Sequence, residues 1–213
     1  MKKWLVCFPF LFVLFGCQSI TDNSTPEEPK QIDDVSSYLV VEHLSDSMDR
    51  GNHEYEGTIV INEGFYKENS FQRGEVVYYK TPELNEEYSN ATPSEYNIAR
   101  IIALPGESIK IKDGQVFIDN KKLDTFYGKS LRSGLTKEEF LDVAKKFLDV
   151  TGTKDNAYNT EFYEEYFSRN MEEFKLSNNQ LFVLGDNGPR SIDSTIFGPI
   201  DTDEIGGKVV GIK

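Results

Sequence analysis

The sequence predicts a mainly β protein, an antiparallel β-domain that carries a two-helix insertion. Short runs rich in Val, Ile, Tyr and Phe alternate with Gly and Pro turns, which is typical of antiparallel sheets. Residues 96–119 join an apolar run, a Pro105-Gly106 turn and a hairpin around Asp113-Gly114. After this hairpin the apolar residues change to helical spacing, which indicates the insertion.

The first sixteen residues form a signal peptide and not a membrane span. Lys2 and Lys3 precede twelve mostly apolar residues, whereas a helix needs about 20 to cross a bilayer. The run Leu14-Phe15-Gly16-Cys17 resembles the lipobox of bacterial lipoproteins, in which the cysteine is lipidated and becomes the new N-terminus. The alternative is an ordinary secretory signal that happens to end near a cysteine.

The charge of the chain limits its binding partners, and its cysteine content limits its disulfides. The chain has 36 acidic and 23 basic residues, which disfavours nucleic acid and gives no general attraction to anionic lipid. Attachment to a membrane is therefore expected through lipid on Cys17. Because Cys7 would leave with the signal peptide, we expect no disulfide, and no motif indicates a metal or another cofactor.

Residues 17–37 are expected to be a lipidated N-terminus and a flexible tether, since they are polar and nearly devoid of large apolar groups. A tether of this length would reach roughly 25 Å. The ordered domain is expected over 38–213, with strands near residues 38–41, 58–62, 75–80, 98–104, 109–112, 116–118, 180–184 and 207–212.

The helical insertion is expected over about 128–176. Thr136 and Glu139 form a capping box, and Gly152 supplies a stop for the first helix. A second helix is predicted from about Thr160 to Phe174. Its aromatic stripe is expected to pack on the parent domain, with ligand binding as the alternative.

Four separated motifs resemble those of one family, the type I signal peptidases. These are membrane-bound serine proteases that remove signal sequences at the outer face of the membrane. They occur in the family's order: Ser47-Met48, Arg73-Gly74-Glu75-Val76-Val77, Arg100 to Glu107, and Gly185-Asp186-Asn187 with Ser191, Asp193, Ser194, Phe197 and Gly198. The resemblance implies the signal-peptidase type of antiparallel β-domain. It also implies a place on the extracytoplasmic face of a bacterial cell membrane.

The resemblance implies Ser47 as the candidate nucleophile and a lysine as its base. A serine hydroxyl needs such a base, and burial can lower the pKa of a lysine enough to serve. In the family the lysine precedes the arginine matched by Arg100, but here that residue is Ala99. Ser45 stands where some relatives supply an oxyanion hydroxyl, and the backbone N–H of Ser47 would be the other donor. Ser191 and Asp193 match further site residues. The favoured alternative is structural: Asp186 and Asn187 cap a turn, and Ser191 satisfies buried backbone groups.

Several functional hypotheses follow. The favoured one is a catalytically impaired member that binds an extended peptide, such as a signal-sequence-like segment, by adding it to a sheet edge. The alternative is an active serine endopeptidase that processes signal peptides with Ser47 and an unrecognised base, for which His43 and His53 are the histidines available. A third hypothesis is a structural lipoprotein whose insertion docks on another envelope component.

Overall fold

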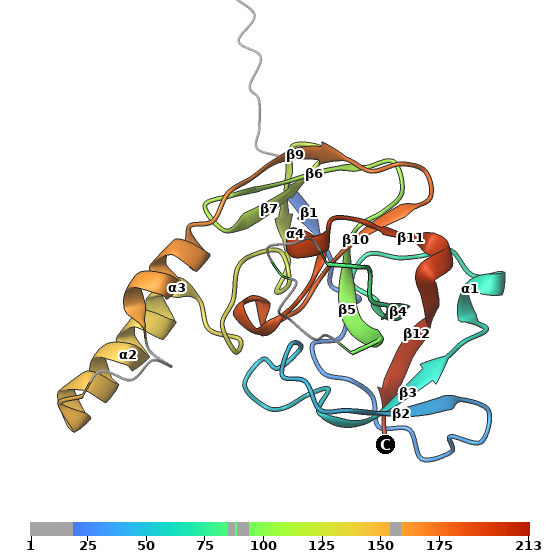
Figure 1. Cartoon of the computed structure of the whole chain (residues 1–213), viewed down its shortest axis with the longest axis horizontal. Coiled ribbons are helices and arrows are strands. Elements are labelled where there is room, and N and C mark those ends of the chain that lie inside the picture. Colours follow the sequence, from blue (N-terminus) through green and yellow to red (C-terminus); the bar gives the residue numbers. More distant parts are fainter. Residues whose placement is uncertain (1–18, 85–87, 89–93, 154–158) are drawn as a thin grey trace, which may run out of the picture.

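The computed structural model describes residues 19–84, 88, 94–153 and 159–213, which form two sheets and four α-helices (Figure 1). The larger sheet has the order β11-β10-β5-β4-β12-β3-β2. Its strands are β2 (Leu39–His43), β3 (Gly57–Asn62), β4 (Val76–Lys80), β5 (Tyr96–Ala103), β10 (Gln180–Leu184), β11 (Ile200–Asp201) and β12 (Ile205–Ile212). The smaller sheet has the order β1-β8-β7-β6-β9, with β1 (Ser19–Thr21), β6 (Ser108–Lys112), β7 (Gln115–Ile118), β8 (Lys121–Asp124) and β9 (Met171–Lys175).

The predicted fold class is confirmed, because strands dominate and all strand pairs except β1 with β8 are antiparallel. The hairpin of β6 and β7 turns at Asp113 and Gly114, whose φ angles of 48° and 72° are those of a type I′ turn. A side chain on Gly114 would collide with the Phe167 carbonyl. Helices α1 (Phe65–Glu68) and α4 (Ser194–Phe197) are single turns.

Strands β5 and β10 connect the two sheets. Ile102 and Ala103 of β5, with Phe182 and Leu184 of β10, belong to the apolar core of the smaller sheet. The earlier part of β5 faces two other clusters, one with Ile98 and one with Ala99. Successive strand residues point to opposite faces, so β5 contributes to the cores on both sides of the larger sheet.

The N-terminal segment differs from the expected tether. Ser19–Thr21 forms β1 beside β8, and further along Ile32 donates its backbone N–H to Ile212 at 2.8 Å. Between these points Asp22 accepts the Tyr127 hydroxyl at 2.7 Å. Residues 19–32 therefore lie along the domain, because local polar groups find backbone and side-chain partners there. The predicted signal peptide, 1–16, and Cys17 lie outside the described residues.

The insertion contains α2 (Lys137–Thr151) and α3 (Thr160–Phe167), which project from the domain (Figure 1). The Thr136–Glu139 capping box is present, and Gly152 ends α2 in the left-handed conformation at φ 67°. The second helix is shorter than predicted, because residues 171–175 form β9 and pair with β6. No helix in the described ranges is long and apolar enough to cross a membrane.

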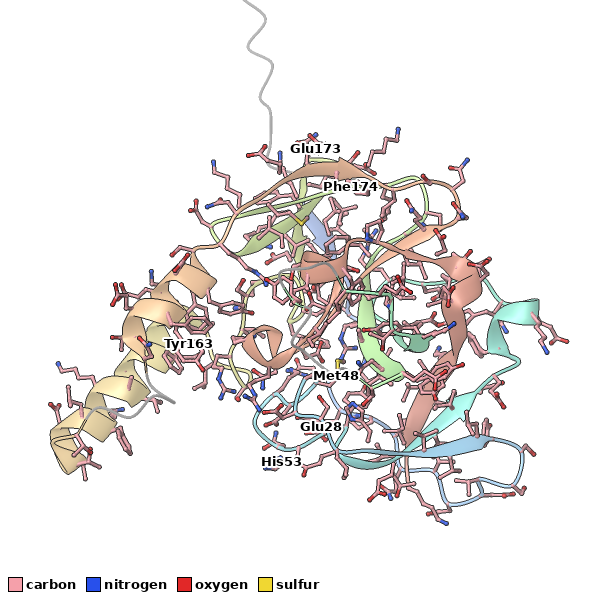
Figure 2. All side chains as sticks on the ribbon, viewed as in Figure 1. Glu28, Met48, His53, Tyr163, Glu173 and Phe174 are labelled. Carbon is pink, nitrogen blue, oxygen red and sulfur yellow. The ribbon has the colours of Figure 1, made fainter. Side chains whose placement is uncertain are left out.

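The aromatic stripe divides its contacts between the two helices and the parent domain, where Met171 packs against the core of the smaller sheet. Phe140 and Ala144 of α2 form one buried cluster with Tyr163 and Phe167 of α3. Figure 2 shows Tyr163 in this position. Phe162 stays 51% exposed, whereas Tyr166 reaches the domain and donates its hydroxyl to the Leu131 carbonyl at 3.1 Å.

Candidate functional site

Arg100, the one charged residue of β5, has a hydrogen-bond partner for each of its guanidinium nitrogens. Arg100 is 1% exposed and meets the Asp186 carboxylate with both Nε, at 2.8 Å, and Nη2. Its Nη1 donates to the Gly74 carbonyl at 2.8 Å. Burial alone would lower the pKa of Arg100, but Asp186 and Tyr55 outweigh it and that pKa lies above its ordinary value. This bidentate pair joins β5 to the turn after β10.

Asn187 fastens the loop that carries Ser47 to the rest of the site. Its backbone N–H donates to the Ser47 carbonyl at 2.9 Å, and its Nδ2 donates to the Asp46 carbonyl at 3.0 Å. Its Oδ1 accepts the Ser133 N–H at 3.1 Å and Arg132 Nη1 at 3.2 Å. Asn187 is fully buried, so one side chain connects the Ser47 loop to the base of the insertion.

Ser47 itself is buried and its hydroxyl is unused. The residue is 6% exposed, and its Oγ has no hydrogen-bond partner among the described residues. The neighbouring Met48 is 0% exposed and belongs to the same apolar cluster as Ile98 of β5. The loop is thus fixed by its backbone and by Met48, while the Ser47 hydroxyl makes no polar contact with the described residues.

The two candidate oxyanion donors contact each other. The backbone N–H of Ser47 donates to the Ser45 hydroxyl at 3.2 Å. An oxyanion hole requires donors aimed at a common external point. In this arrangement the Ser47 N–H is directed to a neighbouring side chain and not toward a substrate oxygen.

Ala99 lies in an apolar cluster of the larger sheet. It is 1% exposed, pairs with Val77 of β4 and shares a cluster with Val183 of β10. Two residues after Val183, a side chain on Gly185 would collide with the Ser191 hydroxyl and lie 2.7 Å from the Ser47 carbonyl. The structure therefore brings Ser191 and the Ser47 loop together at the end of β10, while Ala99, which the resemblance matches with the base lysine, contributes a methyl group to the apolar cluster that it shares with β10.

Neither histidine contacts the Ser47 hydroxyl. His43 Nδ1 lies 2.8 Å from the Tyr55 carbonyl, and its buried Nε2 has no partner among the described residues. Burial lowers the pKa of His43, although its bond to Tyr55 opposes this shift. His53 lies on the surface beside Glu56, with Nδ1 2.6 Å from that carboxylate, as Figure 2 shows at the rim of the molecule.

Asp193 and its neighbours hold the turn after β10. Asp193 is 1% exposed, and its carboxylate accepts the Gly185 N–H at 3.1 Å and the Thr195 hydroxyl at 2.7 Å. The Ser191 N–H donates to the Gly188 carbonyl at 3.1 Å, and Ser194 Oγ accepts the Val183 N–H at 3.0 Å. These contacts give the segment a structural role, while the catalytic roles of Ser191 and Asp193 stay predictions.

Residues remote in sequence complete the surroundings of the Ser47 loop. Arg50 donates to the Glu27 carboxylate at 2.8 Å, and Arg190 donates to the Asp46 carboxylate at 2.7 Å. Arg132 reaches Asn187 from the insertion. These partners are 23, 144 and 55 residues apart, so sequence spacing gave no signal for them. No cluster of metal-binding side chains occurs within the described ranges.

A protein-family model and individual known proteins that resemble this chain all belong to one protein family. A model of the family described as signal peptidase, peptidase S26, matches residues 35–212. Signal peptidase I V of Bacillus subtilis (strain 168) is 27% identical over 151 residues, which are 71% of this chain and 71% of that protein. Signal peptidase I of Bacillus licheniformis is 26% identical over 162 residues, covering 76% of this chain and 68% of that protein.

A further relative and a solved structure are also similar to this chain. Signal peptidase IB of Staphylococcus aureus (strain COL) is 26% identical over 154 residues, which are 71% of this chain and 65% of that protein. A crystal structure of a signal peptidase I from Enterococcus faecalis V583 covers 66% of this chain and 97% of its own, with 22% identity and a TM-score of 0.37.

Proposed function

The chain belongs to the signal peptidase family, peptidase S26, and from that premise we propose that it is a lipid-anchored member that binds an extended peptide without cleaving it efficiently. One observation carries this proposal. The Ser47 hydroxyl is buried and has no partner among the described residues, and Ala99 stands where the resemblance places the base lysine. Loss of one catalytic group in a serine protease lowers turnover by a factor on the order of 10⁴ to 10⁶.

An incomplete strand pairing supports peptide binding. Strand β4 pairs with residues 96–100 of β5, but β10 pairs only with residues 100–103. The backbone groups of Ile101 point toward β4, because its N–H donates to Glu75 and its carbonyl accepts the Gly74 N–H. By alternation, those of Ile98 point toward the side where β10 does not pair. Ile98 is 2% exposed, so an extended peptide would add there by displacing the groups that cover this part of β5.

The cleavage test uses the full chain in detergent with a signal-peptide substrate. We expect no serine-dependent turnover, so wild type and Ser47→Ala should give the same background rate by mass spectrometry of the products. Turnover that disappears in Ser47→Ala would instead support the alternative of an active endopeptidase. In that case His43→Gln is informative, because the buried Nε2 of His43 has no hydrogen-bond partner among the described residues and is free to accept a proton.

The binding test uses the same protein and a fluorescent signal-sequence-like peptide. A second peptide of identical sequence carries N-methyl groups on alternate backbone nitrogens, which removes the hydrogen bonds that edge addition requires. We expect saturable anisotropy with the first peptide and at least about tenfold weaker binding with the second. Equal binding of both peptides, or of neither, contradicts edge addition.

Lipid attachment at Cys17 has a separate test. Intact-mass measurement of the membrane fraction should show removal of residues 1–16 and added acyl mass on Cys17. Two or more acyl chains give stable attachment, whereas one gives marginal attachment. Cys17→Ser should appear unprocessed or in the soluble fraction, and unchanged mass and fractionation would refute the anchor.

A further inference from the structure

Strand β1 fixes the start of the described chain directly on the smaller sheet. Ser19 pairs with Lys122 of β8, and Ile20 packs against the core of this sheet. Cys17 precedes Ser19 by two residues, and an extended chain covers at most about 7 Å over that distance. A lipid on Cys17 would therefore hold this edge of the smaller sheet next to the bilayer, and not at the end of a long tether.

A row of basic and aromatic side chains begins at the same point. Ser19 lies opposite Lys122, Lys122 opposite Phe117, and Phe117 opposite Lys110. Residues opposite each other in a sheet share a face, so these four side chains form one line across β1, β8, β7 and β6. Lys112 follows Lys110 by two residues on the same face, and Lys175 lies opposite Ser108.

We call Lys110, Lys112, Lys122, Lys175 and Phe117 the lysine face. Lys112 and Lys175 are exposed, and no ion pair or hydrogen bond engages either ammonium group within the described part of the chain. Lys110 Nζ lies 5.7 Å from the centre of the Phe117 ring, and both side chains are half-buried. The opposite side of the sheet is the apolar core, so the lysine face points outward.

Three carboxylates only partly offset these lysines. By register, Asp124 lies on the same face and pairs with Lys122 at 2.9 Å, and the bulge of β9 between Met171 and Phe174 places both Glu172 and Glu173 there. Asp119 lies at the rim, where it accepts the Ser108 N–H at 3.0 Å. Figure 2 shows Glu173 at the outer edge of β9. Four lysines against three carboxylates leave this face slightly positive in a chain whose net charge is −13.

We propose that the lysine face lies against an anionic phospholipid surface and sets the orientation of the domain on the membrane. The proposal rests on the lipid anchor of the proposed function, since the anchor brings this face to the headgroups. Ammonium groups on long apolar stems and an aromatic ring suit the interface between headgroups and acyl chains. The acidic remainder of the surface is repelled by anionic lipid, which leaves this face as the favourable contact.

The main test is a lysine footprint of the full chain in vesicles. The protein is reconstituted in phosphatidylcholine with about 30% phosphatidylglycerol, in phosphatidylcholine alone, and in detergent, then treated briefly with an amine-acylating reagent. Mass spectrometry gives the rate at each lysine. Lys145 on the projecting α2 is the internal reference, because it is exposed and far from β1 in the fold (Figure 1).

We expect Lys110, Lys112 and Lys175 to react at least about threefold more slowly in the anionic vesicles than in detergent, with Lys145 unchanged. Protection should be weaker in phosphatidylcholine alone, since charge attraction is absent there. Equal rates at all of these lysines in vesicles and detergent would overturn the proposal. Protection that depends on protein concentration and persists in detergent would also overturn it, because it would assign the face to a second protein copy.

Charge variants provide an independent readout. Lys112→Glu with Lys175→Glu should abolish the difference between anionic and neutral vesicles, whereas Lys145→Glu with Lys146→Glu should retain it. Both pairs are exposed, so the native fold of each variant can be checked by circular dichroism. The intact mass separates the two proposals. A protein without acyl mass refutes the anchor, while an acylated protein with unprotected lysines refutes the orientation alone.

Discussion

Two neighbouring residues of β5 have opposite surroundings. Arg100 is a buried charge whose guanidinium meets Asp186 and the Gly74 carbonyl, whereas Ala99 contributes only a methyl group to an apolar cluster. The buried ion pair of Arg100, which joins β5 to the turn after β10, is complete, while the lysine expected to activate Ser47 is absent. The fold of this site therefore does not depend on its catalytic base, because Arg100 serves the fold and position 99 would supply the base.

The largest expected effect tests the contribution of the Arg100–Asp186 pair to stability. Asp186→Ala should destabilise the protein by about 3–5 kcal/mol, since it leaves the buried Arg100 guanidinium without its counter-charge. Urea denaturation measures the free energy of unfolding. Asp124→Ala is the matched control, because its pair with Lys122 is largely exposed and its loss should change stability by about 1 kcal/mol or less. Similar losses in both variants would contradict the importance given to the buried pair.

A lysine at position 99 tests the apolar surroundings of Ala99. Ala99→Lys should lower stability by roughly 3 kcal/mol near pH 7, because the apolar cluster favours the neutral amine and depresses its pKa. Above this depressed pKa the folded state binds fewer protons than the unfolded state, so stability should recover as the pH rises toward the ordinary lysine pKa. Ala99→Met, with a chain of comparable length and no charge, should show no such recovery. A pH-independent loss in Ala99→Lys would indicate overpacking alone.

Asn187→Ala tests the fastening of the Ser47 loop. The substitution removes the side-chain bonds to the Asp46 carbonyl, the Ser133 N–H and Arg132, at a cost of about 2 kcal/mol in unfolding free energy. Hydrogen exchange should increase at residues 45–50 and 131–135 together, because one side chain holds both segments. Asn179→Ala, at an exposed amide, is the control. Faster exchange in only one of the two segments would show that they are held separately.

The smallest effect concerns the candidate nucleophile. Ser47→Ala should leave stability unchanged or raise it by up to about 1 kcal/mol, since a buried hydroxyl without a partner costs free energy. Ser194→Ala should instead destabilise by about 1 kcal/mol, because its hydroxyl accepts the Val183 N–H. Thermal denaturation of the two variants compares them directly. A marked loss in Ser47→Ala would mean that the hydroxyl has a stabilising partner.

Much of the large sheet and of the insertion's first helix could be predicted from local patterns. The Asp113-Gly114 turn, the capping box at Thr136 and the stop at Gly152 each depend on a few adjacent residues. The second helix was predicted too long, since the three-residue spacing of Met171 and Phe174 suits a helix. In β9 a bulge between them lets both residues pair with the apolar residues of β6, and this pairing decided the structure. Strand β1 could not be predicted because its three residues, of which Ile20 alone is apolar, become a strand only beside β8.

The sequence by itself determined the alternation of strands and turns, the motif order and the alanine at position 99, because each is a property of neighbouring residues. Only the tertiary structure decided that Ser47 is buried without a partner and that Arg100 meets Asp186, 86 residues away. It also decided that residues 19–32 lie on the domain and bring a lysine face to the start of the chain. Contacts across such separations depend on how the strands pair, which no local pattern specifies.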